Sequence, residues 1–171
     1  MLKKFLPDEF VENVFKITPE MLINRGIKGV ITDLDNTLVA WDRPDATPEI
    51  IKWLTSLKEA GIEVTIVSNN NELRVKAFSE PIDMVFVSKA NKPLKIGFKR
   101  ALKLMQTKKS ETVVIGDQLL TDIFGGNRAG MHTILVIPVA TNDAKITTFN
   151  RNLERFIMNR LRNRGLIYWE E

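Results

Sequence analysis

Five short apolar runs alternate with amphipathic helical stretches along this 171-residue chain, and that alternation limits the fold more than any other feature. The runs are rich in β-branched residues and apolar almost throughout, which is typical of parallel strands covered on both faces. Strands that alternate with helices predict βαβ units with right-handed crossovers. The predicted strands are residues 29–33, 63–67, 84–87, 112–115 and 133–137. We therefore predict an α/β fold of three layers, with a Rossmann-like, mainly parallel sheet and helices on both faces.

Polar residues follow the predicted strands at the point where each one ends. In a parallel sheet the ligand site lies beyond the carboxyl ends of the strands, so side chains that follow different strands meet there. The polar segments are Asp33 with Asp35, Ser68-Asn69-Asn70, Ser88-Lys89 and Gly116-Asp117-Gln118. Their convergence predicts one site at this edge of the sheet.

The first of these segments carries two carboxylates two residues apart, Asp33 and Asp35, on a turn after a strand. Such a pair could hold Mg²⁺, which prefers one or two carboxylates together with water and a substrate phosphate. A carboxylate beside the cation stays ionised and can attack phosphorus, while the other can protonate a leaving oxygen and then activate water. The alternative is an acidic turn that is only solvated.

Three further segments supply groups that suit the same chemistry. Asp117 could reach the metal, and Asp122 could steady a metal-bound water or a lysine. The hydroxyl of Ser68 and the amides that follow it form an anion site at a helix N-terminus. Lys92 could neutralise phosphate charge. Each group has a plainer alternative, which is a helix N-cap for Asp117 and Ser68 and a solvated surface position for Lys92.

Composition removes several other kinds of site. The chain has no cysteine and a single histidine, His132, so thiol nucleophiles, disulfides and histidine clusters are excluded. No run approaches the roughly 20 apolar residues of a membrane span. The apolar part of the first seven residues is too short for a secretory signal. We therefore expect a cytoplasmic protein whose catalysis rests on carboxylates, hydroxyls, lysines and a hard metal ion.

Together these segments resemble the haloacid dehalogenase (HAD) superfamily of aspartate-nucleophile phosphatases. The pattern of that family is Asp-x-Asp-x-Thr, then Ser or Thr, then Lys, then Gly-Asp-x-x-x-x-Asp, and residues 29–137 contain it in order. The resemblance implies a phosphomonoester hydrolase that forms an aspartyl phosphate and uses Mg²⁺. It implies Asp33 as nucleophile, Asp35 as general acid and base, Thr37, Ser68, Asn69 and Lys92 as substrate-binding residues, Asp33, Asp117 and the backbone carbonyl of Asp35 as metal ligands, and Asp122 as a residue that supports those ligands.

The spacing of the motifs also predicts the shape of the site. The segments between Asp35 and Ser68 and between Ser68 and Lys92 must supply strands and helices, which leaves no room for a large cap domain. An open site suits a phosphate presented by something large, such as a membrane lipid, a nucleic-acid end or a protein. The alternative is a lid supplied by an oligomer partner, in which case a soluble sugar phosphate would fit.

Longer matches point to one branch of the capless subfamily IIIA. They resemble the YqeG-type branch, which includes the phosphatidylglycerophosphate phosphatases of mitochondria and plastids. The matching segments are residues 33–38, 68–70, 116–122 and 125–136, with Trp41 and the opening Phe5-Leu6-Pro7. The resemblance implies a role in phospholipid biosynthesis, in which phosphatidylglycerophosphate is dephosphorylated to phosphatidylglycerol. The alternatives are a nucleic-acid end, a phosphoprotein or a soluble sugar phosphate as substrate, or a binding module that keeps the fold without the chemistry.

Basic residues gather near the end of the chain. The net charge is +4, and residues 145–164 hold six Lys or Arg against Glu154 alone. A basic amphipathic helix in this segment could lie on an anionic membrane surface, at the inner face of the membrane. The alternative is that its apolar stripe packs on the domain. The stripe consists of Leu153, Phe156, Ile157 and Leu161, and the chain then ends with Ile167-Tyr168-Trp169 and two glutamates.

These elements predict a single domain over residues 1–171. Its core is expected at about 26–140. The N-terminal segment 1–25 and the basic helix at about 147–164 are expected as accessory elements.

Overall fold

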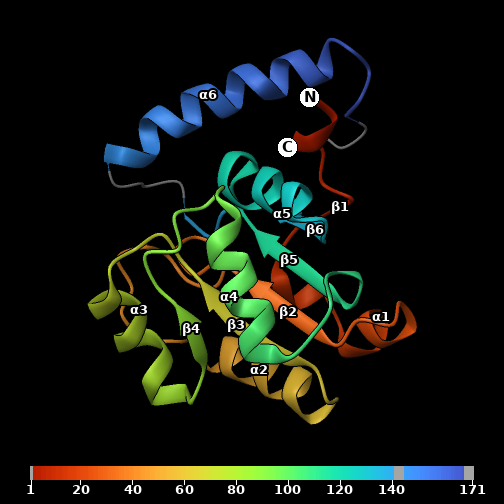
Figure 1. Ribbon diagram of the computed structural model, residues 1–171. Helices are drawn as coiled ribbons and strands as arrows, with labels where there is room; N and C mark the ends of the chain where they lie inside the picture. Colours follow the sequence, from red (N-terminus) through yellow and green to blue (C-terminus); the bar gives the residue numbers. More distant parts are fainter. Residues whose placement is uncertain (1, 141–144, 168–171) are drawn as a thin grey trace.

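The computed structural model describes residues 2–140 and 145–167. Six parallel strands form its central sheet, in the order β1-β6-β5-β2-β3-β4 (Figure 1). The strands are β1 (Glu9–Val11), β2 (Gly29–Thr32), β3 (Glu63–Val67), β4 (Val85–Val87), β5 (Thr112–Gly116) and β6 (His132–Val136). The helices are α1 (Pro19–Asn24), α2 (Pro48–Glu59), α3 (Glu72–Ser79), α4 (Lys95–Met105), α5 (Phe124–Ala129) and α6 (Lys145–Arg162). The prediction of an α/β fold with a Rossmann-like parallel sheet is confirmed.

Strand β2 lies at the centre of the sheet and sets the position of the site. Its first residue, Gly29, lies opposite both Glu63 of β3 and Thr112 of β5. The chain runs from β2 outward through β3 to β4 and then crosses back to β5. The strand order therefore reverses between β2 and β5, and the loops after these two strands diverge. Ligands bind at such a reversal, beyond the carboxyl ends of the strands.

Alternate residues of the central strands point to opposite faces of the sheet, and each face is covered by helices. Val30 of β2 belongs to the core beneath α1, α2 and α3, and the next residue, Ile31, belongs to the core beneath α4 and α5. Helix α4 crosses the near side of the sheet in Figure 1. The sheet is thus the middle of three layers.

The N-terminal segment is part of this core and adds a sixth strand that the sequence pattern did not predict. Strand β1 pairs in parallel with β6 at the edge of the sheet. The carboxylate of Asp8 accepts the amide of Thr133 at 2.8 Å, which fixes the start of that pairing. Behind the strand, Val14, Ile17 and Leu22 are buried in the core under α2. A strand of three half-buried residues carries too little periodicity to be recognised.

The segment after β5 does not begin as a regular α-helix. Residues Leu119–Ile123 form a wide turn with π-helical hydrogen bonding, η5, and α5 follows directly from it. Gly130 ends α5 in the left-handed conformation with φ +83°, which glycine adopts readily. Wide turns of this kind are frequent at functional sites.

Helix α6 packs on η5 rather than standing away from the domain. Ile157, Met158 and Leu161 are buried, whereas Leu153 and Phe156 of the expected stripe are exposed. Met158 joins a small core with residues of η5, β6 and β1. The apolar stripe is therefore divided between the domain and the solvent. The side chain of Arg151 and the aromatic residues Tyr168 and Trp169 lie outside the described residues.

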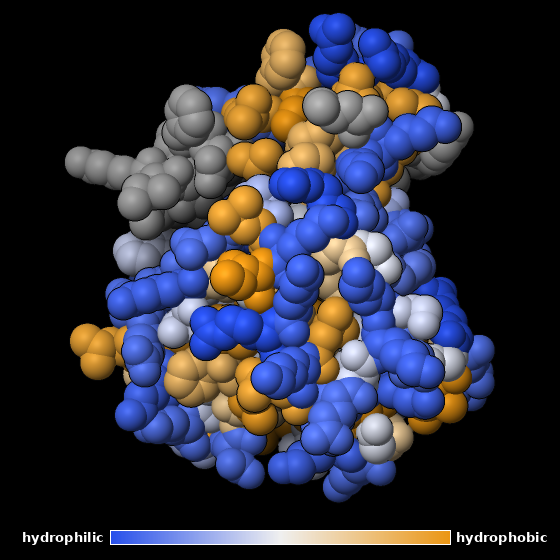
Figure 2. Space-filling view, in the orientation of Figure 1, coloured by the Kyte–Doolittle hydropathy of each residue, from blue (hydrophilic) through white to orange (hydrophobic). Residues whose placement is uncertain are grey.

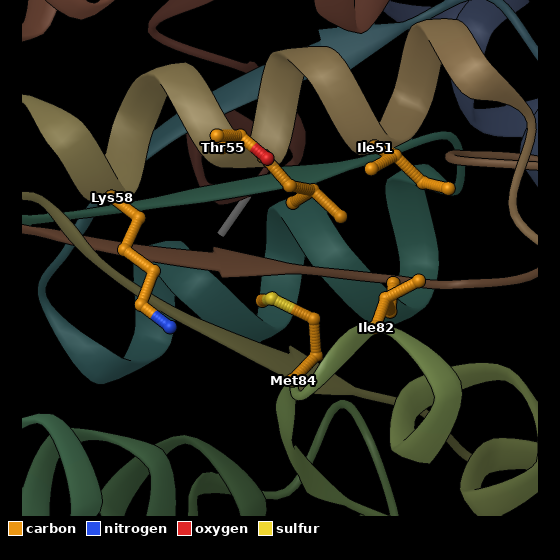
Figure 3. Close-up of a pocket in the computed structure, with 6 residues that line it drawn as sticks. Ile51, Thr55, Lys58, Ile82 and Met84 are labelled. Atoms are coloured by element: carbon orange, nitrogen blue, oxygen red, sulfur yellow. The ribbon is translucent and has the colours of Figure 1, made fainter.

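The described residues include no large cap domain. Residues 33–47, between β2 and α2, form only a short flap, in which Asp35 makes an isolated parallel bridge with Val39. No helix among the described residues is both long and apolar enough to cross a bilayer. A small, mostly apolar hollow lies between α2 and the segment before β4, lined by Ile51, Leu54, Thr55, Lys58, Ile82 and Met84 (Figure 3).

Candidate active site

Four strands deliver the predicted site residues to the same edge of the sheet. Asp33 follows β2, Ser68 follows β3, Lys92 follows β4 and Asp117 follows β5. All four side chains are buried, as is that of Asp122 on η5. Asp33, Lys92, Asp117 and Asp122 meet in one group, which we call the buried charge cluster.

Lys92 is the only cation of the buried charge cluster. Its Nζ lies 2.7 Å from an oxygen of Asp33 and 2.7 Å from an oxygen of Asp122, and 3% of its side chain is exposed. Burial by itself would lower the pKa of Lys92, but the charges of Asp122 and Asp33 raise it above its ordinary value. The lysine is therefore a fixed positive charge, shared between two carboxylates.

The side chain of Asp122 packs against the backbone of β5 at Gly116, which explains why this position is a glycine. A Cβ on Gly116 would lie 2.3 Å from the carboxylate carbon of Asp122, so no larger residue fits there. The second oxygen of Asp122 accepts the amide of Gln118 at 3.2 Å. Asp122, and not Asp117, thus satisfies an amide at the start of η5. Both oxygens of Asp122 are engaged within the protein.

The carboxylates are arranged to receive a cation. Ligand atoms of Asp33, Asp117 and Asp122 all lie within 4.8 Å of one another. One oxygen of Asp117 accepts the hydroxyl of Thr37 at 3.0 Å, while the other is buried without a hydrogen-bond partner among the described residues. Burial raises the pKa of Asp33 to about 7, and burial with the charge of Asp33 raises that of Asp117 well above its ordinary range. A hard divalent cation between Asp33 and Asp117 would satisfy both carboxylates, so the donor set fits Mg²⁺.

Asp35 is held by contacts that the sequence pattern does not predict. One of its oxygens accepts two hydrogen bonds from Arg74, from NH2 at 2.9 Å and from Nε at 3.1 Å. The other accepts the side-chain amide of Asn70 at 2.9 Å, and Arg74 also donates to the carbonyl of Pro44 in the flap. Arg74 lies on α3, and no sequence signal identifies it, because an arginine on a helix gives the same pattern whether it is solvated or faces a carboxylate.

Ser68 and Asn69 have different partners from each other. The side chain of Asn69 accepts the backbone amide of Lys92 at 2.6 Å and donates to its carbonyl at 3.0 Å, so it holds the lysine loop. The hydroxyl oxygen of Ser68 accepts the amide of Asn70 at 3.0 Å. Its hydrogen is left to donate to an anion. Thr37, which is also predicted to bind substrate, donates its hydroxyl to Asp117.

His132 and Arg128 lie outside the buried charge cluster. His132 contacts the carboxylate of Glu9 and so connects β6 to β1. The guanidinium carbon of Arg128 lies 5.4 Å from the ring centre of Phe124, in a cation–π contact within α5.

Known proteins are similar to this chain in sequence and in fold. A family model described as HAD-hydrolase-like matches residues 89–162. The chain is 63% identical to the probable phosphatase YqeG of Bacillus subtilis, over 100% of both chains. It is 28% identical to phosphatidylglycerophosphate phosphatase 1, chloroplastic/mitochondrial, of Arabidopsis thaliana, over 94% of this chain and 49% of that protein. It therefore spans about half the length of the Arabidopsis relative.

Solved structures show the same fold at low sequence identity. The cobalt-bound deoxy-D-mannose-octulosonate 8-phosphate phosphatase YrbI from Haemophilus influenzae superimposes with a TM-score of 0.55, over 79% of this chain and 89% of that one, at 16% identity. The motif order, the strand reversal and the full-length relative agree. The chain belongs to the HAD-like hydrolases, as a phosphatase of that family.

Proposed function

We propose that the protein is a Mg²⁺-dependent phosphomonoester hydrolase in which Asp33 forms an aspartyl phosphate. The observation that carries this proposal is the buried charge cluster, in which an oxygen of Asp33 lies 2.7 Å from Lys92 and ligand atoms of Asp33 and Asp117 lie within 4.8 Å of each other. Asp33 and Asp117, with the backbone carbonyl of Asp35, would hold the metal. When bound, Mg²⁺ supplies positive charge that keeps the carboxylates ionised and offsets charge on the phosphoryl group.

The residues of the chain divide the two chemical steps between them. An oxygen of Asp33 bonds to phosphorus while the bond from phosphorus to the substrate oxygen breaks, and Asp35 gives its proton to that leaving oxygen. Lys92 and the hydroxyl of Ser68 stabilise the phosphoryl oxygens. Asp35 then removes a proton from water as the water attacks phosphorus, which releases Asp33 and inorganic phosphate.

We propose phosphatidylglycerophosphate as the substrate. Two observations support it: the Arabidopsis relative is named for that activity and aligns with 94% of this chain, and residues 33–47 form a short flap instead of a cap. An open site can receive a head group that stands in a membrane. Such a substrate would place the protein in the cytoplasm, at the inner face of the membrane.

The test is phosphate release with Mg²⁺ from phosphatidylglycerophosphate in mixed micelles. A 3′-phosphorylated oligonucleotide, a phosphopeptide and a sugar phosphate serve as competing substrates, and Asp33→Asn serves as the control. We expect selective release from the lipid and none by Asp33→Asn. Preference for another ester would overturn the lipid assignment, and turnover by Asp33→Asn would overturn the mechanism.

A further inference from the structure

The longest stretch of the sequence without an acidic residue is rich in basic residues and includes Lys92. Residues 84–110 contain eight Lys or Arg and no Asp or Glu. This stretch includes the loop after β4 and the whole of α4. Helix α6 is also basic, but it contains Glu154. The basic character of α4 is therefore the more uniform of the two.

Basic and apolar side chains are exposed together at the start of α4. Leu94 and Ile96 are 55% and 59% exposed. The residues Lys89, Lys95 and Lys99 around them are also exposed, and none of these lysines forms an ion pair with a described carboxylate. We call these five residues the α4 rim.

The α4 rim borders the active site. Leu94 comes two residues after Lys92, at the carboxyl edge of the sheet where the site lies. The inner side of α4 is fully committed to the core, because Phe98, Ala101 and Met105 are buried against the sheet. Figure 2 views the molecule from the α4 side and shows apolar patches among hydrophilic residues on this face. The rim is therefore free to meet a partner that approaches the site.

The composition of the rim selects the kind of partner. A polyanion with a hydrophilic surface would satisfy the lysines but leave Leu94 and Ile96 in water. An anionic bilayer satisfies both, because aliphatic side chains enter the region between head groups and acyl chains while lysines stay at the lipid phosphates. Single-stranded nucleic acid is usually held by stacking aromatic side chains, and the rim has none.

We propose that the α4 rim docks the active site onto an anionic lipid bilayer. This inference rests on the proposed lipid substrate and names the surface that would bring the site to it. Helix α6 is a weaker candidate for this contact because three of its apolar residues are buried against the domain.

The test is binding to vesicles of phosphatidylcholine with 30% phosphatidylglycerol, measured by co-sedimentation beside vesicles of phosphatidylcholine alone. The variant is Lys95→Glu/Lys99→Glu. Matched controls with the same change in charge are Lys52→Glu/Lys58→Glu on α2 and Arg155→Glu/Arg160→Glu on α6, all at exposed positions. A second variant, Leu94→Ser/Ile96→Ser, removes the apolar part of the rim without changing charge.

We expect wild-type protein to bind the anionic vesicles, the rim charge variant to bind at least about tenfold more weakly, and both control pairs to bind within about threefold of wild type. The serine variant should also bind more weakly. The proposal is overturned if wild-type protein does not bind the anionic vesicles, or if the control pairs lose as much binding as the rim charge variant. It is also overturned if the protein binds a single-stranded oligonucleotide, tested beside the vesicles, more tightly than it binds the anionic vesicles.

A soluble substrate separates this proposal from the proposed function. The rim variants should hydrolyse p-nitrophenyl phosphate as wild type does, which also shows that they fold. Vesicle binding by the rim without release of phosphate from phosphatidylglycerophosphate would retain the docking surface and reject the substrate. Release of that phosphate with unchanged vesicle binding in the rim variants would do the reverse.

Discussion

Two lysines three residues apart, Lys92 and Lys95, have opposite surroundings. Lys92 lies in the buried charge cluster, within 2.7 Å of two carboxylates. Lys95 is exposed on the α4 rim and has no ion-pair partner among the described residues. A buried cation must be paired because water cannot solvate it, whereas an exposed cation keeps its hydration and is available to a partner. Burial, more than residue type, thus separates the lysine that we propose to act on the phosphate from the lysine that we propose to meet the bilayer.

The two basic helices extend the same contrast. Helix α4 packs one face on the sheet and leaves a basic and apolar outer face. Helix α6 uses part of its apolar stripe to cover η5, and Glu154 accepts the amide of Leu120 at 2.9 Å. Because η5 carries Asp122, α6 supports the site from behind. Deleting α6 would therefore remove its charges and its support of η5 together, so a truncated chain cannot test either one alone.

The largest effect is expected from Lys92→Ala. The substitution leaves the buried carboxylates of Asp33 and Asp122 without their cation and removes the charge that is proposed to stabilise the transferred phosphoryl group. We expect kcat/KM to fall about 10³-fold on both lipid and soluble substrates. Lys95→Ala should stay within about twofold on p-nitrophenyl phosphate. A loss under tenfold for Lys92→Ala would contradict the role given to the buried charge cluster.

The next largest effect is expected on the free energy of unfolding, to which α6 and the outer face of α4 should contribute differently. Leu161 of α6 is fully buried, so Leu161→Ala should lower the free energy of unfolding by about 2–5 kcal/mol. Ile96→Ala, on the outer face of α4, should change it by no more than about 0.5 kcal/mol. Urea denaturation of both variants measures the difference. Equal destabilisation would mean that the outer face of α4 is packed like α6.

How far the sequence predicts this architecture differs by region. Apolar runs and the polar residues after them locate β2 to β6 and bring Asp33, Ser68, Lys92 and Asp117 to one edge, because chain direction alone determines where parallel strands end. The partner of Asp35 was not predictable in the same way. An arginine such as Arg74 on a helix has the same sequence signature whether it is solvated or faces a carboxylate.

The apolar stripe of α6 was ambiguous for a related reason. Its i, i+3, i+4 spacing shows that one face is apolar but not what covers that face. Only the tertiary contacts show that Ile157 and Leu161 are buried while Phe156 is exposed. Strand β1 could not be predicted even as a strand, because three residues are too few to show a period.

Asp33 makes the metal-free protein sensitive to pH. Its pKa is about 7 in the folded protein and 3.8 without the fold, because burial disfavours the charged carboxylate. Between these values the folded state binds more protons than the unfolded state, so stability falls as pH rises from about 4 through 7. Melting temperatures in EDTA at pH 5, 6 and 7 should show this decline, with a smaller slope for Asp33→Asn. A rise in stability over this range would contradict the assignment.

The smallest of these effects is expected at Arg74, which we infer to be a positioning residue for Asp35. Its two hydrogen bonds to the carboxylate, with that from Asn70, fix the side chain of Asp35 within the flap. Without Arg74 the carboxyl group is less well placed to protonate the leaving oxygen. That proton matters most when the leaving group is a poor one, such as an alkoxide, and least for p-nitrophenolate.

Arg74→Ala should therefore lower kcat/KM about tenfold for an alkyl phosphate such as glycerol phosphate and only about twofold for p-nitrophenyl phosphate. The ratio kcat/KM reports the steps up to formation of the aspartyl phosphate, so the later use of Asp35 as a base does not obscure the comparison. Arg74→Lys, which keeps the charge but loses the paired hydrogen bonds, should fall between wild type and Arg74→Ala. Equal losses on both substrates would mean that Arg74 only supports the flap, through its contact with Pro44, and has no part in placing the acid.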